Sequence, residues 1–83
     1  MLSDRVVVDY IKDEMLMSPD VEYVWVDKIC KLAVVDSQMY NYLSQYMATE
    51  DEQIRRFLYR KMQLFYNDYF SQWLIKKLKK LKD

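Results

Sequence analysis

The sequence contains no glycine, and this absence restricts how its chain can turn. At the average usage of about 7%, a chain of this length would contain roughly six glycines. Tight β-hairpins depend on Asn-Gly, Asp-Gly or Gly-Gly turns, so a fold rich in β-sheet is disfavoured. Glycine-rich phosphate loops are excluded, including the P-loop and the dinucleotide-binding fingerprint. We therefore expect an all-α fold.

Apolar residues that recur at helical spacing predict a small bundle of three to four helices, forming a single domain over residues 1–83. The expected helices cover residues 4–17, 19–35, 38–48 and 50–81. The apolar stripe of the second helix includes Val24 and Ile29, and that of the last helix includes Phe57 and Leu58. The last and basic helix contains neither proline nor glycine and would be on the order of 45 Å long, so part of it must protrude or bend. Residues 6–8 and 21–26 could alternatively form strands, but the helical pattern continues past both.

Short polar residues predict where the helices begin. These starts are Ser3 with Asp4, Ser18 with Pro19 and Asp20, Asp36 with Ser37, and Thr49 with Glu52. Pro19 suits the first turn of a helix, and Asp20 places a negative charge near its positive end. Thr49 and Glu52 match a capping box, in which the Thr49 side chain accepts a hydrogen bond from the Glu52 amide.

The charges balance overall, with 13 basic and 13 acidic residues, but they are divided along the chain. Residues 1–52 contain four basic and eleven acidic residues, a net charge of −7, whereas residues 53–83 contain nine basic and two acidic residues, a net charge of +7. Such asymmetry indicates a charged partner. Alternatively, the basic helix folds back on the acidic helices, or packs on a second copy, so that the charges neutralise each other.

Several chemistries are disfavoured because the necessary side chains are missing. The sequence has no histidine, and the lone Cys30 can form neither an internal disulfide nor a zinc cluster. Cys30 follows apolar Ile29, so we expect a buried, inert thiol. Asp9 and Asp13 could pair around a cation, but a solvated helix face is the simpler interpretation. We expect no enzyme, metal, cofactor or small-molecule substrate.

The same features indicate where the protein works. No stretch approaches the length of a membrane span, and the N-terminal segment is interrupted by charges, unlike a signal peptide. One unpaired cysteine fits a reducing compartment. We therefore expect a soluble, cytoplasmic protein.

Eight tyrosines and six methionines favour a binding function, because both residue types are enriched at adaptable protein interfaces. The leading hypothesis is a small, regulatory interaction protein: a subunit, adaptor or inhibitor of a larger assembly, or a homodimer. Aromatic and arginine residues of the last helix are expected to bind the partner, because these types dominate interface energies. They are Arg55, Arg56, Tyr59, Arg60, Tyr66, Tyr69 and Trp73.

Two alternatives use the basic residues of the same helix. A nucleic-acid-binding regulator could use the cluster of Arg55, Arg56, Arg60 and Lys61 with its neighbouring aromatics, although the chain as a whole has a pI near 6.2. A membrane-surface protein could use the basic helix end, where lysines accompany leucines. These lysines are Lys76, Lys77, Lys79, Lys80 and Lys82. They also suit a solvated helix end, whose negative dipole they stabilise.

Leu58-Tyr59-Arg60 resembles the tripeptide signature of the small mitochondrial LYR-motif family. The resemblance would imply a helical adaptor for iron–sulfur or respiratory assemblies. In that family the tripeptide lies near the start of the first helix, whereas here it lies in the last third of the chain. We therefore do not infer membership.

Overall fold

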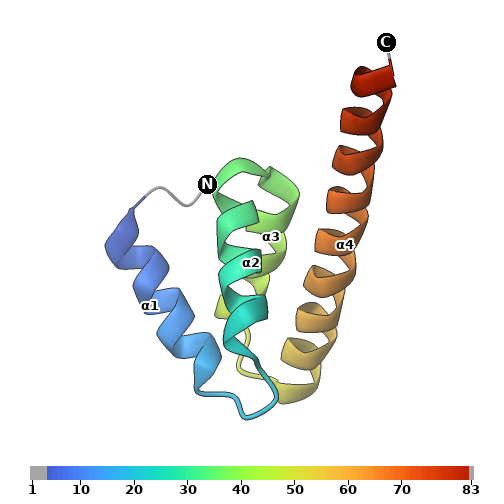
Figure 1. The fold of residues 1–83 in the computed structure, drawn as a ribbon. Coiled ribbons are helices and arrows are strands. Elements are labelled where there is room, and N and C mark those ends of the chain that lie inside the picture. Colours follow the sequence, from blue (N-terminus) through green and yellow to red (C-terminus); the bar gives the residue numbers. More distant parts are fainter. Residues whose placement is uncertain (1–3, 83) are drawn as a thin grey trace.

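The computed structural model describes residues 4–82, with side chains for residues 4–81, and this range folds as an all-α bundle. Its helices are α1 (Arg5–Leu16), α2 (Tyr23–Val35), α3 (Ser37–Ala48) and α4 (Glu52–Lys82). The helices α2, α3 and α4 pack against one another, and α1 packs along α2 at the edge opposite α4 (Figure 1). The expected fold class is confirmed; Ser3, expected at the first helix start, lies outside the described residues.

Two predicted helix starts are confirmed by side-chain hydrogen bonds. The Asp4 carboxylate accepts a hydrogen bond from the N–H of Val6 (2.8 Å), and the Asp36 carboxylate accepts one from the N–H of Met39 (2.9 Å). The backbone N–H of Asp36 also donates to the carbonyl of Leu32 (2.8 Å) at the end of α2. Asp36 therefore ends α2 and begins α3.

The predicted start of the second helix is wrong, because Pro19 belongs to a turn that precedes α2. The N–H of Val21 donates to the carbonyl of Ser18 (3.2 Å), which closes a β-turn. Pro19 occupies the second position of this turn, where proline is favoured. Glu22 then has an extended backbone and forms the N-cap of α2. Its N–H donates to the hydroxyl of Tyr59 (3.3 Å), so α4 supplies the partner at this helix start.

The predicted capping box at Thr49 is also wrong. The Asp51 carboxylate begins α4, since it accepts hydrogen bonds from the N–H groups of Gln53 (2.9 Å) and Ile54 (3.2 Å). Thr49 instead accepts from the N–H of Asp51 (3.3 Å). A carboxylate at the positive end of a helix forms charge-assisted hydrogen bonds, which are stronger than those of a hydroxyl. The helix consequently begins at Glu52, later than expected.

The buried side chains form one cluster to which every helix contributes. They are Ile11 and Met15 of α1, Val26, Ile29, Cys30, Leu32 and Ala33 of α2, Met39, Leu43 and Tyr46 of α3, and Leu58 and Met62 of α4. Both of the buried α4 residues lie in the first half of that helix. The last turns of α4 extend beyond the ends of α2 and α3, and the molecule measures 48 × 27 × 20 Å (Figure 1).

The faces that two helices turn inward differ from the predicted apolar stripes. Val24 and Phe57 were expected in these stripes, yet 57% and 60% of their surfaces are exposed. Val26 and Met62, which the stripes omit, are fully buried. Apolar residues occur on several sides of α2 and α4, so periodicity alone does not select the buried side. Packing between the helices decides it.

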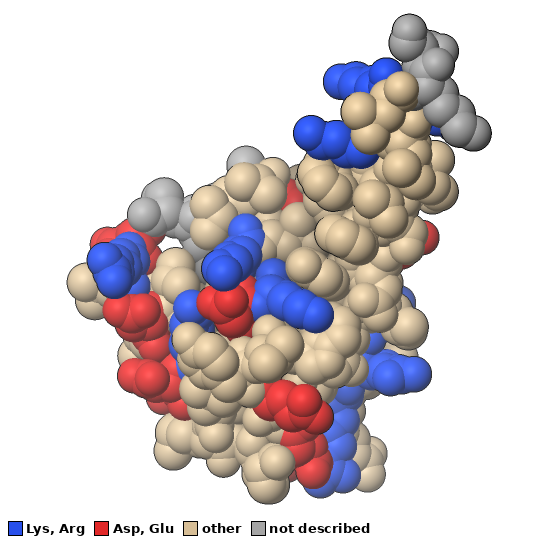
Figure 2. All heavy atoms as spheres, in the orientation of Figure 1, with Lys and Arg blue, Asp and Glu red and all other residues tan. Residues whose placement is uncertain are grey.

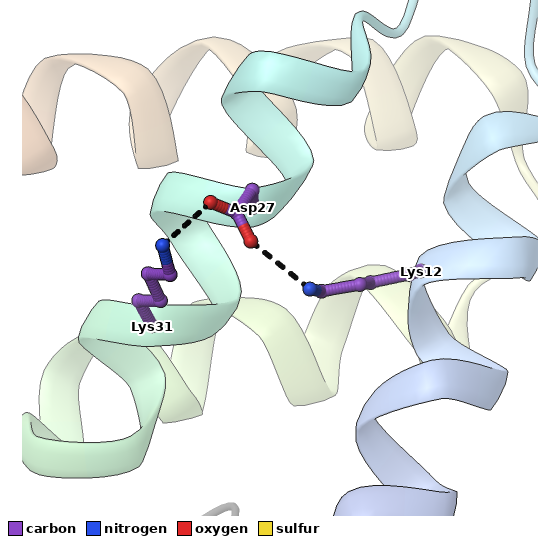
Figure 3. A network of polar contacts seen from close by, with 3 residues as sticks. All are labelled: Lys12, Asp27 and Lys31. Carbon is purple, nitrogen blue, oxygen red and sulfur yellow. Dashed lines mark hydrogen bonds and ion pairs between the residues drawn. The ribbon is translucent and has the colours of Figure 1, made fainter.

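Asp27 on α2 forms two ion pairs, and the one with Lys12 joins α1 to α2 (Figure 3). One carboxylate oxygen lies 3.0 Å from Nζ of Lys12 on α1, and the other lies 2.9 Å from Nζ of Lys31 on α2. The hydrogen bonds from Lys31 and Lys12 hold the pKa of Asp27 below its ordinary value. The hydrogen bond with Asp27 raises the pKa of Lys12 in turn. The paired, charged state is therefore favoured in the fold.

Replacing Asp27 with Asn is expected to lower the free energy of unfolding at neutral pH by up to about 1 kcal/mol, as for other partly exposed ion pairs. Because the folded-state pKa is depressed, this stabilisation is present above the ordinary carboxyl pKa of about 3.9 and is lost as pH falls through the folded-state value. The free energies of unfolding of wild type and Asp27→Asn, measured with urea, should therefore converge as the pH falls. Asp9→Asn, on the exposed side of α1, is the control; a pH-independent gap for Asp27→Asn would contradict the assignment.

Replacing Met62 with Ala should lower the free energy of unfolding by about 2–5 kcal/mol, because the fully buried side chain leaves a cavity. Leu64→Ala is the matched control on the same helix, where 54% of the side chain is exposed, and should change stability by less than about 0.5 kcal/mol. Denaturant unfolding followed by circular dichroism measures both. Equal losses would mean that α4 packs through a different side.

Candidate protein-binding surface

The second half of α4 presents large apolar side chains to solvent. Every residue from 67 to 81, here called the projecting segment, is exposed. Its large apolar residues are between 40% and 82% exposed. They are Tyr69, Phe70, Trp73, Leu74, Ile75, Leu78 and Leu81. Such a concentration of apolar surface is unusual for a monomeric protein and is typical of an interaction site.

The aromatic residues continue the side of α4 that faces the bundle. The rings of Tyr66 and Phe70 stack with centroids 6.4 Å apart, and those of Phe70 and Trp73 stack at 5.8 Å. The rings of Phe65 and Tyr69 pair at 6.4 Å with their planes tilted by 33°. These pairs lie three or four residues apart, so they support one another on the helix surface. The result is an ordered aromatic surface that leads out of the core.

A groove of about 300 Å³ runs between the aromatic surface and the end of α2. It is lined by Lys31, Leu32 and Val35 from α2 and by Tyr66, Tyr69, Phe70 and Trp73 from α4. Trp73 also borders two further hollows along the projecting segment, one beside Tyr69 and one among the lysines. Trp73 is therefore central to the exposed apolar surface.

The far side of the projecting segment is apolar as well. With about 3.6 residues per turn, Ile75 and Leu78 lie opposite Trp73, and Leu74 lies at the border between the two sides. Lys77 and Lys79 flank this outer apolar side, and Lys77 Nζ lies 5.4 Å from the centre of the Trp73 ring. The segment thus combines two apolar sides with a basic end.

The positive charge of the projecting segment is not neutralised by the described part of the chain. Lys76, Lys77, Lys79 and Lys80 are exposed and take part in none of its ion pairs. Figure 2 shows lysines at the outer end of α4 and acidic side chains along α1 at the other edge. Within residues 4–81 the ion pair of Arg56 with Asp20 (3.4 Å) links α4 to the acidic half. The charge division predicted from the sequence is therefore a separation in space.

Three of the residues expected to bind a partner are engaged inside the bundle. Arg55 donates to the Thr49 carbonyl and lies over the Tyr46 ring, 5.3 Å from its centre. Tyr59 is half-buried, which raises the pKa of its hydroxyl, and it accepts the hydrogen bond at the start of α2. Tyr66 meets Trp25 edge-on at 5.9 Å. Their contacts position α4 against the bundle.

The other expected residues are exposed. Arg56 forms the exposed ion pair to Asp20, and Arg60 faces solvent one turn further on. Tyr69, Trp73 and the four lysines at positions 76, 77, 79 and 80 belong to the projecting segment. Lys82 lies in α4, but its side chain is outside the described residues.

The set of residues expected to bind a partner omitted five of the seven apolar residues of this surface: Phe70, Leu74, Ile75, Leu78 and Leu81. Phe70 lies four residues after Tyr66 and three before Trp73, and this helical spacing is the signal that could have identified it.

No three carboxylate or thiol groups among residues 4–81 lie close enough to hold a metal ion. Cys30 is buried, as expected, and burial raises the pKa of its thiol to about 11. The helices of residues 4–82 lack the combination of length and apolar composition that a bilayer crossing requires.

The Cys30 thiol should react slowly with a disulfide reagent while the protein is folded. At mildly alkaline pH, a pKa of about 11 lowers the thiolate fraction by about 100-fold or more relative to an ordinary cysteine, and burial restricts access further. Absorbance on reaction with Ellman's reagent measures the rate, and the urea-unfolded protein is the reference. Equally fast reaction of both states would show that Cys30 is accessible.

Comparisons with protein-family models, curated proteins and solved structures find no match to this chain. The functional evidence therefore lies in the geometry of the projecting segment. That geometry offers an extended apolar and basic surface in a position that a partner can enclose.

Proposed function

We propose that this chain is a non-catalytic protein-binding protein, which acts as a subunit, adaptor or inhibitor of a larger intracellular assembly. Its binding element is the projecting segment. The observation that carries the proposal is the continuous exposure of residues 67–81, which includes seven large apolar side chains. Burial of such side chains is the main source of affinity between proteins.

The distribution of these side chains around the helix favours a partner that encloses it. Trp73 and Phe70 lie on the bundle side of α4, and Ile75 and Leu78 lie on the outer side. Covering both sides removes more apolar surface from water than covering one side does. A partner that supplies further helices, or a deep groove, covers both sides at once, whereas a flat surface covers one.

The nucleic-acid alternative receives less support from the geometry. Three of the four residues in its basic cluster already have contacts within the chain: Arg55 with Thr49, Arg56 with Asp20, and Lys61 with the Phe57 ring at 5.3 Å. Phosphate binding would have to displace them.

One observation favours the membrane alternative as a second candidate. Ile75 and Leu78 lie on one side of the helix end and Lys76 and Lys80 on the other, which is the layout of an interfacial helix. The apolar bundle side of Trp73 and Phe70 would stay uncovered on a flat membrane, so a protein partner remains the better fit.

The double variant Phe70→Ser/Trp73→Ser tests the proposal. Tagged wild type is expected to capture a stoichiometric protein partner from extract of its native cells, and the variant should capture at least about tenfold less, because interface aromatics each contribute about 2 kcal/mol or more. Quantitative mass spectrometry of the captured proteins is the measurement.

Tyr23→Ser/Val24→Ser is the matched control, because it removes exposed apolar surface from α2 and should leave capture unchanged. Circular dichroism must show the same helix content in all three proteins. Equal capture by wild type and by Phe70→Ser/Trp73→Ser would overturn the proposal.

A further inference from the structure

A second apolar groove lies on the opposite edge of the molecule, between α1 and α3. It has a volume of about 240 Å³. It is lined by Val7, Tyr10, Ile11, Tyr40, Leu43, Ser44 and Met47. Tyr10 is 60% exposed, although it borders this groove. The groove therefore offers apolar surface that the chain's own core does not cover.

The rim of this groove is acidic. Asp13 and Glu14 follow Tyr10 by three and four residues, so they lie beside it on the surface of α1. Figure 2 shows acidic side chains gathered along α1. The ion pairs of the described residues leave both carboxylates without a basic partner. A helix that fits here needs an apolar side flanked by positive charge.

The outer side of the projecting segment has this pattern. Ile75 and Leu78 provide the apolar side, and Lys77 and Lys79 flank it. An amphipathic helix that places its apolar side in a groove is a common mode of recognition. The segment cannot reach the groove of its own chain, because α1 and the end of α4 lie at opposite edges of the molecule (Figure 1).

We propose that the groove between α1 and α3 binds the projecting segment of a second copy, so that two copies form a closed, twofold-symmetric dimer. This inference rests on the proposed function and names a second copy as the partner of the outer side of the same segment; the bundle side, with Phe70 and Trp73, stays available to a further protein. A twofold rotation carries the basic end of each copy to the acidic edge of the other, and each contact is made twice. Dimerisation brings the +7 segment of one chain to the −7 segment of its partner.

A dimer in which the two projecting segments pack against each other is disfavoured. Such a contact would bring together two segments that each carry Lys76, Lys77, Lys79 and Lys80, and like charges at close range repel. Contact between the projecting segment of one copy and the acidic edge of the other avoids this repulsion. Charge complementarity also makes the association dependent on salt.

Charge exchange between two full-length variants tests the dimer. Lys77→Glu/Lys79→Glu makes the projecting segment acidic, and Asp13→Lys/Glu14→Lys makes the rim of the groove basic. In each variant alone, segment and rim then have the same sign, so the dissociation constant of the homodimer should rise at least about tenfold. In an equimolar mixture every contact is complementary again, and a mixed dimer should form.

Sedimentation equilibrium and native mass spectrometry measure the outcome. Wild type should give twice the chain mass of 10.3 kDa, and raised salt should weaken the dimer. Gln38→Glu/Gln53→Glu, which adds negative charge at exposed positions away from both surfaces, should remain dimeric. Circular dichroism reports whether each variant is folded.

Three results would overturn the inference: wild type that is monomeric at every concentration, variants that dimerise alone as well as wild type does, or a mixture of folded variants that stays monomeric. Flotation of monomeric wild type with phosphatidylglycerol vesicles would assign the segment to a membrane instead. If wild type is monomeric but the captured partner is lost with Phe70→Ser/Trp73→Ser, the proposed function stands and the second copy is excluded as its partner.

Discussion

The structure depends on a mismatch in helix length. The helices α2 and α3 contain 13 and 12 residues, whereas α4 contains 31. At about 1.5 Å per residue, α4 is more than twice as long as the helices that it packs against. A helix satisfies its own backbone hydrogen bonds, but it buries side chains only where a neighbour exists. Leu58 and Met62 are buried against the bundle, whereas every residue from 67 to 81 is exposed and the last turns of α4 pass beyond α2 and α3.

The distribution of charge over the molecule follows from the same arrangement of helices. Near the core, one carboxylate, Asp27, is shared by Lys12 and Lys31, and this local balance ties α1 to α2. The lysines of α4 have no comparable neighbour in the described residues, because the acidic helix α1 lies at the other edge. A chain with zero net charge thereby acquires two strongly charged ends. Such ends act on the orientation of a partner and on its rate of association.

Much of the fold could be predicted from the sequence, because its signals are local. The absence of glycine and the helical spacing of apolar residues predicted four helices, and Asp36 predicted the start of α3. The predicted starts of α2 and α4 were wrong, because more than one local hydrogen-bonding pattern fits the sequence at each of them. Ser18 accepts the turn hydrogen bond from Val21 instead of capping a helix, and Asp51 displaces Thr49 as the cap.

The candidate site could be predicted only in part. Aromatic and basic composition identified Tyr69, Trp73 and the lysines at the helix end. It did not show that Tyr59 would turn inward, because its partner at Glu22 is 37 residues away in the sequence. Local patterns do not encode contacts of that separation. Contacts of this kind decide which side of α4 faces the bundle. The exposed side cannot be identified until that packing is known.

The single residue between α2 and α3 bears on how the chain folds. Because Asp36 ends one helix and begins the next, the two helices are joined without a flexible loop, and little chain entropy is lost in bringing them together. Most contacts between helices also join elements that are consecutive in the sequence. Chains with such local contacts fold quickly. The α2–α3 hairpin is thus suited to form first, with α1 and the early turns of α4 adding to a surface that already exists.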